Sequence, residues 1–320
     1  MHRTFEISVS SHATDQLIEQ LAALEDVIGL SLQRGASIKP EGDVITVHAL
    51  NRSADEVLRC VAALPSNTSV SIATGELTSL SDPENNESID NDVDEALWEE
   101  METGVRHQGR LTSNYLALMA LGGALASIGL ISERVPQAIC FISASIIAPG
   151  FEPIAKIPLG LLLRHPHRWK RGLVSSLAGY AVLMLASAAM FGVLLLGHET
   201  SAHELIENSQ VKMMRHPHLP DLLQSACAAV AGVVIIAAYR RSVIAGALAA
   251  LTIIPAAALV GAAAIAGQGE MALAALRRTG IDVLFIIGAG LLVFGLKQAT
   301  THSRRRLPFE EPRGKVQPAG

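Results

Sequence analysis

The chain has 320 residues, of which 50% are hydrophobic and 17% charged, and its formal net charge is −5. This negative balance argues against a nucleic-acid-binding protein, because such proteins carry clustered positive charge. Most acidic residues precede Arg110, and the chain beyond it is mostly apolar. The asymmetry predicts a soluble head followed by a membrane body.

The chain shows no recognisable reaction centre. Met1–Ser10 lacks the apolar core of a cleaved signal peptide, so we expect none. The three cysteines, Cys60, Cys140 and Cys227, do not have metal or redox spacing. No nucleophile, base or paired carboxylates stand out, and we therefore expect no metal, no cofactor and no enzymatic activity.

The first 80 residues alternate between the patterns of strands and helices. Four stretches alternate apolar and polar residues or hold clustered β-branched residues, and two carry apolar residues at helical spacing. The expected strands are 4–10, 27–33, 44–47 and 70–77, and the expected helices are 12–25 and 51–64. Gly35 and Pro40-Glu-Gly42 are expected to form a turn region between the second and third strands. The order βαββαβ is the split βαβ pattern, so residues 1–80 are predicted to form an α+β ferredoxin-like domain. By analogy with the fold alone, this head would be a regulatory or dimerisation module.

Residues 81–110 form an acidic linker. Ten Asp and Glu residues lie between Ser81 and Glu102, without a Lys or Arg. The first part should be flexible. The second part places Ile89, Val93, Leu97 and Met101 four residues apart, which predicts a short amphipathic helix. This helix is either a solvated connector or a docking element that couples the head to the membrane body.

Residues 111–298 are predicted to be a six-helix membrane domain, since about 20 apolar residues cross the hydrocarbon core. The six expected segments are 114–131, 135–163, 172–196, 222–238, 243–266 and 280–296. The second is too long for one straight crossing, and we expect two half-helices that meet near Pro149–Pro153. The fifth is expected to be interrupted by Pro255. Asp282, near the start of the sixth, is expected at the outer interface.

Basic residues set the expected orientation of the chain. If both ends are cytoplasmic, the inner flanks hold twelve Lys and Arg residues and the outer loops hold five. The five outer residues are Arg134, Lys212, Arg215, Arg277 and Arg278. We therefore expect a multi-pass protein of a bacterial inner membrane, with a cytoplasmic head and a basic cytoplasmic tail over residues 299–320.

The long outer loop, 197–221, contains several histidines and glutamates but no metal-binding spacing. Its Arg215-His-Pro-His218 sequence resembles Arg164-His-Pro-His167, but the topology places the two on opposite sides of the membrane. We expect the polar residues of this loop to be solvated.

The stretch Ser143–Pro158 contains three prolines, a glycine, Glu152 and Lys156 within an apolar region. A charged residue inside the bilayer costs about 2.5–3.5 kcal/mol on insertion scales, so such residues mark candidate sites. Glu152 and Lys156 are four residues apart on the second half-helix, with Pro153 in its first turn. They either form a structural ion pair, or Glu152 is a titratable carboxylate coupled to the movement of a solute or proton.

A weak internal repeat relates the two halves of the membrane domain. Pro149 and Pro255 both interrupt the middle segment of a group of three, with an offset of 255 − 149 = 106. Adding 106 to the start of the first segment gives a position just before the fourth segment. Adding 106 to the start of the third segment gives a position just before the sixth. Three crossings in each unit would give opposite orientations, and inverted repeats with broken helices are typical of transporters. The predicted solute or ion pathway comprises Ser143, Ser145, Pro149, Gly150, Glu152, Pro153, Lys156, Thr252 and Pro255.

Four stretches resemble a known family in their order along the chain: Arg110–Asn114, Ala124–Leu130, Ile147–Pro149 with Pro153, and Gly246–Val260 around Pro255. They are similar to the bacterial uncharacterised hydrophobic-domain proteins, domain of unknown function 389, over 111–296. Members of this family often carry a soluble N-terminal domain. Glu152 and Lys156 depart from the small or apolar residues usual there, and the resemblance implies no activity.

The sequence therefore predicts a transporter or channel for an unidentified small solute, which contacts the lipid bilayer and no nucleic acid and forms a homo-oligomer. The alternative is a membrane sensor or scaffold that does not transport, whose head binds an effector or partner.

Overall fold

The computed structural model describes residues 2–92, 95–98, 100–101, 110–163, 166–239 and 242–300. The chain divides into two compact units, one formed by Met1–Leu97 with Gln298–Gly320 and the other by Trp98–Lys297. The described elements of the first unit are β1 (Arg3–Val9), α1 (Ser11–Ala22), β2 (Val27–Ile38), β3 (Glu41–Ala49), η1 (Asn51–Ser53), α2 (Ala54–Ala62), β4 (Val70–Glu76) and α3 (Asn86–Asp90).

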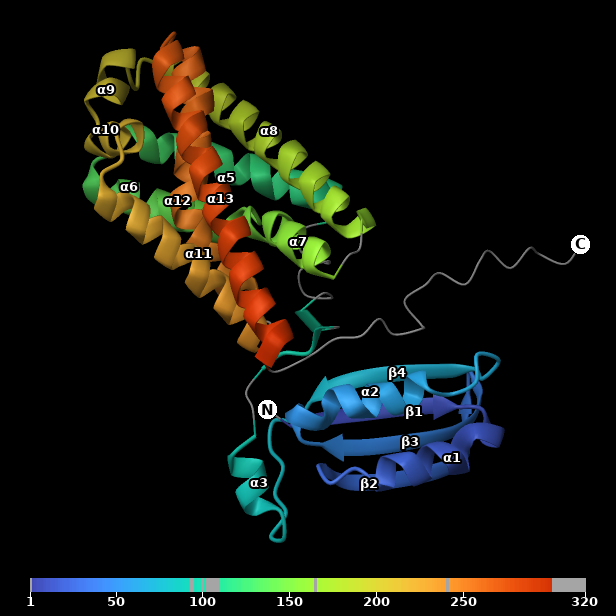
Figure 1. The fold of residues 1–320 in the computed structure, drawn as a ribbon. Coiled ribbons are helices and arrows are strands. Elements are labelled where there is room, and N and C mark those ends of the chain that lie inside the picture. The colour runs from blue at the N-terminus through green and yellow to red at the C-terminus, as the bar shows by residue number, and fades with distance from the viewer. Residues whose placement is uncertain are drawn as a thin grey trace, which may run out of the picture. The chain divides into compact units, whose positions relative to one another are not determined.

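The head is a small antiparallel sheet packed with two helices, as the alternating patterns predict. The strand order is β2-β3-β1-β4, and β1 pairs antiparallel with both β3 and β4. Every second residue of β1 points into the core, where Phe5, Ile7 and Val9 are fully buried. Leu17 of α1 and Val57 of α2 pack into the same core, and Figure 1 shows both helices beside the sheet.

Strand β2 is longer than predicted. The sequence indicates a turn at Gly35, but β2 continues to Ile38 and pairs with β3 through a register shift between Gln33 and Ser37. Gly35 has a φ of 64°, a left-handed conformation that glycine adopts readily. A glycine of this kind permits a bulge inside a strand, so the turn prediction at this point is wrong.

The linker contains a short helix. Residues 86–90 form α3, and Asp92 accepts a hydrogen bond of 2.9 Å from the Asn51 backbone N–H. Helix α3 includes Ile89, the first apolar residue of the predicted amphipathic helix, while the flexibility of the residues before it stays a prediction. Val93, Asp94, Glu99 and residues 102–109 lie outside the described residues, so the predicted amphipathic helix is only partly described.

The second unit is helical. Its described helices of ten residues or more are α5 (Ser113–Ile131), α6 (Arg134–Ile147), α7 (Phe151–Leu162), α8 (Pro166–Leu196), α11 (Leu219–Tyr239), α12 (Ser242–Ile265) and α13 (Gly269–Thr300). Two short helices, α9 (Ala202–Glu207) and α10 (Ser209–Arg215), lie in the connection that follows α8.

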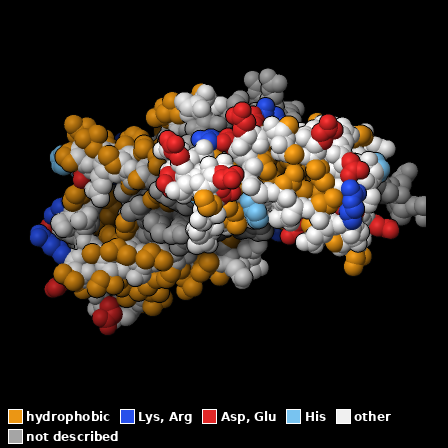
Figure 2. All heavy atoms as spheres, turned by 90° about the horizontal axis from the view of Figure 1, so that it is seen from below, with side chains coloured by type: hydrophobic (Ala, Val, Ile, Leu, Met, Phe, Trp, Pro, Cys, Tyr) orange, Lys and Arg blue, Asp and Glu red, His pale blue; other side chains and the backbone are white. Residues whose placement is uncertain are grey.

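Several of these helices are long and apolar enough to cross a membrane. Among the described residues there are four such helices, or five if the bent pair α6–α7 counts as one span. In α12 the described apolar stretch is the shorter Ala249–Ile265. Large apolar side chains point outwards from α8, including Leu185, which is 69% exposed, and hydrophobic side chains cover much of the helical unit in Figure 2. An apolar outer surface of this kind suits contact with lipid.

Helix α12 lies at the centre of the unit. It contacts α5, α6, α7, α8 and α11. Its residues Ile253–Leu259 are almost all fully buried and include several alanines, which lets neighbouring helices approach closely. Ser187 of α8 donates a 2.7 Å hydrogen bond to the Ala258 carbonyl, which links the two helices.

Candidate functional site

The site predicted from the prolines begins at the break between α6 and α7. Helix α6 ends at Ile147, Ala148 is extended, and α7 begins at Phe151 with a bend of 47°. Pro149 disfavours helical geometry at the residue before it, which explains why α6 ends there. The Gly150 N–H donates to the Ala148 carbonyl at 2.8 Å. The expected pair of half-helices is confirmed.

The expected interruption at Pro255 is wrong. Helix α12 continues from Ser242 to Ile265 with Pro255 inside it. Proline is tolerated within membrane helices where neighbouring helices support the backbone, and α12 is packed on several sides. The sequence shows where a proline removes a hydrogen bond but not whether packing holds the helix together.

The break nevertheless lies beside the Pro255 region of α12. A Cβ built at Gly150 would be 3.6 Å from Ile254 Cδ1, so the two prolines belong to neighbouring segments. Tyr180 of α8 covers the break from another side, since its hydroxyl donates a 3.2 Å hydrogen bond to the Gly150 carbonyl. The same Cβ would be 2.8 Å from Tyr180 Oη, which makes glycine at position 150 a packing requirement.

Glu152 is the buried acid of the site. Its side chain lies in the first turn of α7, and the residue is only 4% exposed. Oε1 lies against α12 at Gly246, where an added Cβ would be 2.7 Å away. Oε2 is buried and has no hydrogen-bond partner among the described residues. An acid held this way is costly to bury, because the lone pairs of Oε2 are not satisfied.

Lys156 lies one turn further along α7 and is half-buried. It is near enough to act electrostatically on Glu152, as their spacing of four residues predicts. Gly172 of α8 makes room for this part of α7, since a Cβ there would be 2.8 Å from both Lys156 Cβ and the Pro153 carbonyl oxygen. Pro153 itself lies in the first turn of α7, as predicted.

The predicted hydroxyl groups are engaged within their own helices. Ser145 donates to the Phe141 carbonyl at 2.7 Å, and Thr252 donates to the Ala249 carbonyl at 3.1 Å. Ser143 is half-buried on α6. The structure thus brings together the residues of the break, Glu152 and α12, while these two hydroxyls are bonded to backbone in this state.

Sequence reasoning missed two tyrosines. Tyr115 donates to the Ser175 carbonyl at 2.9 Å, and Tyr180 lies at the break. Both are buried, and each is near enough to Glu152 to interact electrostatically. A tyrosine inside an apolar segment that also contains a charged residue is a signal that could have found them.

A second buried acid lies in α13. Asp282 is 2% exposed, and its Oδ2 lies 3.4 Å from Nε of Arg278, four residues earlier on the same helix. Arg278 also donates to Ser225 Oγ at 2.5 Å and to the Asp221 carbonyl at 3.2 Å. The sequence predicts Asp282 at the outer interface but not this buried i,i+4 pair, in which each charge offsets the burial of the other.

Comparison with known proteins adds one match. Residues 145–288 match the family described as a domain of unknown function (DUF389). The resemblance seen in the sequence is thereby confirmed over these residues. The DUF389 region contains the break, Glu152, Tyr180, Gly246 and Asp282, so the site lies inside it. No curated protein and no solved structure matches the chain significantly.

Proposed function

We propose that this protein is a transporter or channel for a small solute, in which the α6–α7 break and Glu152 lie on the path. The observation that carries the proposal is a carboxylate with an unpartnered oxygen, buried beside broken backbone in a helical unit with an apolar exterior. Ionisable groups inside membrane segments usually belong to solute, ion or proton pathways.

The break itself supports this reading. The Ala148–Gly150 segment leaves the helical hydrogen-bonding pattern, and irregular backbone at membrane depth is tolerated only in protein interiors or beside cavities. A straight helix would anchor the chain at lower cost. A broken helix beside an acid instead gives a solute both backbone groups and a charge to contact.

The arrangement of helices supports six crossings in two inverted units of three. Adding 106 to the range of α5, 113–131, gives 219–237, and α11 covers Leu219–Tyr239. Adding 106 to the range of α8, 166–196, gives 272–302, and α13 covers Gly269–Thr300. The first and third helices of each unit thus occur in matching places.

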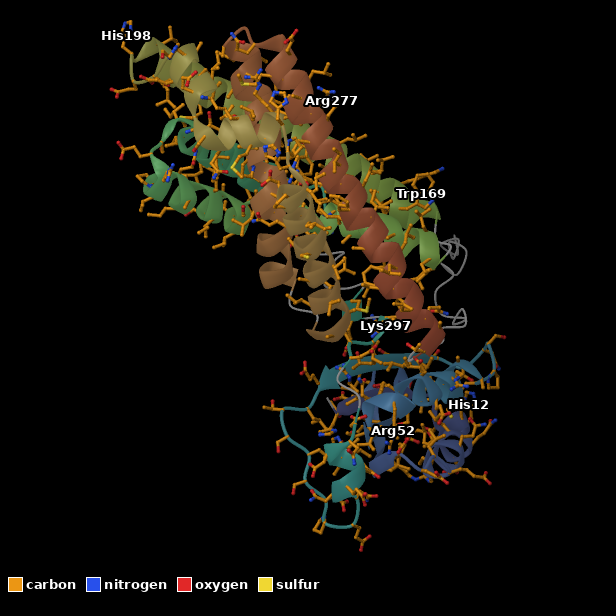
Figure 3. The ribbon with its side chains drawn as sticks, turned by 60° about the vertical axis from the view of Figure 1, so that its left-hand side comes forward. His12, Arg52, Trp169, His198, Arg277 and Lys297 are labelled. Atoms are coloured by element: carbon orange, nitrogen blue, oxygen red, sulfur yellow. The ribbon has the colours of Figure 1, made fainter. Side chains whose placement is uncertain are left out.

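Hydrogen bonds between the first and third helices of each unit indicate that these two helices run parallel. Tyr115 and Ser127 of α5 bond to α8 carbonyls 60 residues later, at Ser175 and Ser187, so α5 and α8 run parallel. Likewise Arg278 of α13 donates to the Asp221 carbonyl of α11, and Lys297 of α13 donates to the Ala237 carbonyl, so α11 and α13 also run parallel. Figure 3 labels Lys297 near the end of α13. Parallel first and third helices are what a unit of three crossings requires.

The charge balance of the flanks favours a bacterial inner membrane with both termini cytoplasmic, where the head would regulate transport or dimerise. Single cysteines at Gln210 and Ser113, in a variant without the native cysteines, test this orientation. A membrane-impermeant maleimide added to intact spheroplasts should label position 210 and not position 113. The reverse labelling would contradict the orientation.

A non-transporting sensor or scaffold is the second candidate. The observation that favours it is the close packing of the break, which Tyr180 and Ile254 cover while Ser145 and Thr252 bond to their own helices. In that case the broken helix would be a structural joint and the head the functional part.

Efflux from proteoliposomes separates the two functions. Vesicles are loaded with a mixture of sodium, potassium, chloride, phosphate and amino acids, and release is measured by ion chromatography and mass spectrometry. A transporter or channel releases at least one of these solutes faster than protein-free vesicles do. Release equal to that of protein-free vesicles for every solute, with and without a membrane potential, would favour the scaffold.

A further inference from the structure

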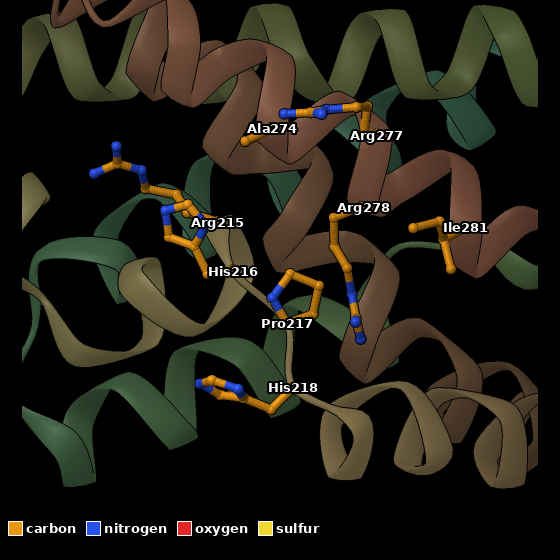
Figure 4. Close-up of a pocket in the computed structure, with 8 residues that line it drawn as sticks. All are labelled: Arg215, His216, Pro217, His218, Ala274, Arg277, Arg278 and Ile281. Atoms are coloured by element: carbon orange, nitrogen blue, oxygen red, sulfur yellow. The ribbon is translucent and has the colours of Figure 1, made fainter.

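A basic pocket lies away from Glu152, between the segment that joins α10 to α11 and the first half of α13. It has a volume of about 470 Å³, and Figure 4 shows the side chains around it. The lining residues are Arg215, His216, Pro217, His218, Ala274, Arg277, Arg278 and Ile281. Three arginines and two histidines line the pocket together with three uncharged residues.

Two carboxylates contact residues of this lining. Asp282 lies against Arg278 Nε, and Asp221 Oδ2 accepts a 2.8 Å hydrogen bond from the His218 backbone N–H. Asp282 therefore offsets the charge of Arg278 alone. Arg215, half-buried, and Arg277, exposed, keep the pocket positive.

Arg278 adds an observation that points to a ligand. The residue is 7% exposed, and its Nη2 and Nε face Ser225, Asp221 and Asp282. Its Nη1 is buried and has no hydrogen-bond partner in the part of the chain that the structure describes. A buried guanidinium N–H without an acceptor is costly, and an anion in the adjoining pocket would satisfy it.

We propose that this pocket binds a tetrahedral oxyanion of the phosphate class. Guanidinium groups bind phosphate oxygens through paired N–H donors, and here three of them come from two separate parts of the chain. Donors on several sides suit an anion with oxygens on several sides better than a planar carboxylate. The phosphate belongs either to a free ion or to the headgroup of an acidic lipid.

The binding test uses the full-length protein in neutral detergent at low salt. Inorganic phosphate is titrated by isothermal titration calorimetry, and retention of phosphatidylglycerol is measured by native mass spectrometry. The variants are Arg277→Gln and the double variant Arg215→Gln with Arg277→Gln. The matched control is Arg171→Gln, since Arg171 is an exposed arginine on α8, outside the pocket.

We expect the protein to bind at least one of the two probes. Arg277→Gln should weaken that binding about tenfold, the double variant should abolish it, and Arg171→Gln should leave it unchanged. Binding of inorganic phosphate assigns the site to the free ion, while retention of the lipid without phosphate binding assigns it to a headgroup. The proposal is overturned if neither probe binds, or if the double variant binds as tightly as the wild type.

Folding of the variants is checked by their thermal midpoints in the same detergent. Arg277 is exposed on α13, so Arg277→Gln should keep the wild-type midpoint. If the midpoint of Arg277→Gln falls, Arg277→Lys takes the place of Arg277→Gln in the test, because lysine retains the charge without the paired N–H donors. Unchanged binding in that variant together with unchanged binding in Arg215→Gln would also overturn the proposal.

Discussion

The Glu152 carboxylate lies against the backbone of α12 at Gly246, with Oε1 2.7 Å from the point that a Cβ at position 246 would occupy. This contact joins the broken helix to the central helix of the unit. It fixes the acid at the interface of the two helices.

Substitution of Gly246 by alanine should destabilise the helical unit by about 1–3 kcal/mol, because the new methyl group meets a buried carboxylate oxygen. The thermal midpoint of the purified protein in detergent reports this. Glu152→Gln keeps the volume and should not relieve the clash. Glu152→Ala removes the oxygen and should restore much of the loss.

Gly280 supplies the control, since a Cβ built there meets no atom within 4 Å. Gly280→Ala should leave stability unchanged or raise it slightly, because alanine is the better helix former. Equal losses in the Gly246 and Gly280 variants would show that the Glu152 contact does not set the cost.

Gly150→Ala should push Tyr180 away from the break, since the added Cβ would be 2.8 Å from its hydroxyl oxygen. The loss of the hydrogen bond to the Gly150 carbonyl alone, tested with Tyr180→Phe, should cost about 1 kcal/mol. In the double variant the two losses should not add, because the residues are in contact. Additive losses in a double-mutant cycle of thermal stability would contradict this coupling.

Breaking the Arg278–Asp282 pair should destabilise the protein more than replacing both of its residues. Asp282→Ala leaves the buried guanidinium without its ion partner and should cost about 3–5 kcal/mol. Replacing both residues with apolar ones, Arg278→Met with Asp282→Leu, should cost much less. Denaturant unfolding followed by tryptophan fluorescence tests this, and a double variant as unstable as Asp282→Ala would refute it.

Acid should weaken the head through Asp43. Its carboxylate accepts a 2.8 Å hydrogen bond from the Gly35 backbone N–H and one of 2.7 Å from the Thr14 hydroxyl. These bonds, first that from Gly35, lower the pKa of Asp43 in the folded state. The stability they provide is therefore present above about pH 4, the usual pKa of an aspartate, and is lost as the pH falls through the lowered value.

Urea unfolding of a fragment of residues 1–97 between pH 7 and pH 2.5 measures this effect. The difference in unfolding free energy between wild type and Asp43→Asn should be constant above pH 5 and shrink below pH 4. Asp15→Asn is the control, because the Asp15 side chain is 80% exposed in its pair with Arg34. A difference for Asp43→Asn that grows as the pH falls would have the wrong sign.

Sequence patterns predicted the elements of the head well because its strands bury one face. In β1 the alternation of Phe5, Ile7 and Val9 leaves a single register that buries all three. The turn expected at Gly35 is wrong because glycine permits both a turn and a bulge. Helix α9 was not predicted, although Ser201 and Glu204 form a capping box that sequence alone can reveal.

In the helical unit the sequence located the break but not its surroundings. Pro149 acts on the backbone next to it, so its effect can be predicted locally. Tyr180 and Gly246 reach the site only through helix packing, which an almost uniformly apolar sequence does not specify. The continuity of α12 through Pro255 depends on the same packing.

Flux through Glu152→Gln proteoliposomes decides whether this carboxylate lies on a solute path. The solute that the wild-type protein releases is measured with Glu152→Gln and with Glu133→Gln, which changes an exposed glutamate at the start of α6. We expect wild-type flux for Glu133→Gln and about a tenfold or greater loss for Glu152→Gln, with equal amounts of folded protein in the vesicles. Wild-type flux in Glu152→Gln would contradict the claim that this carboxylate lies on the path.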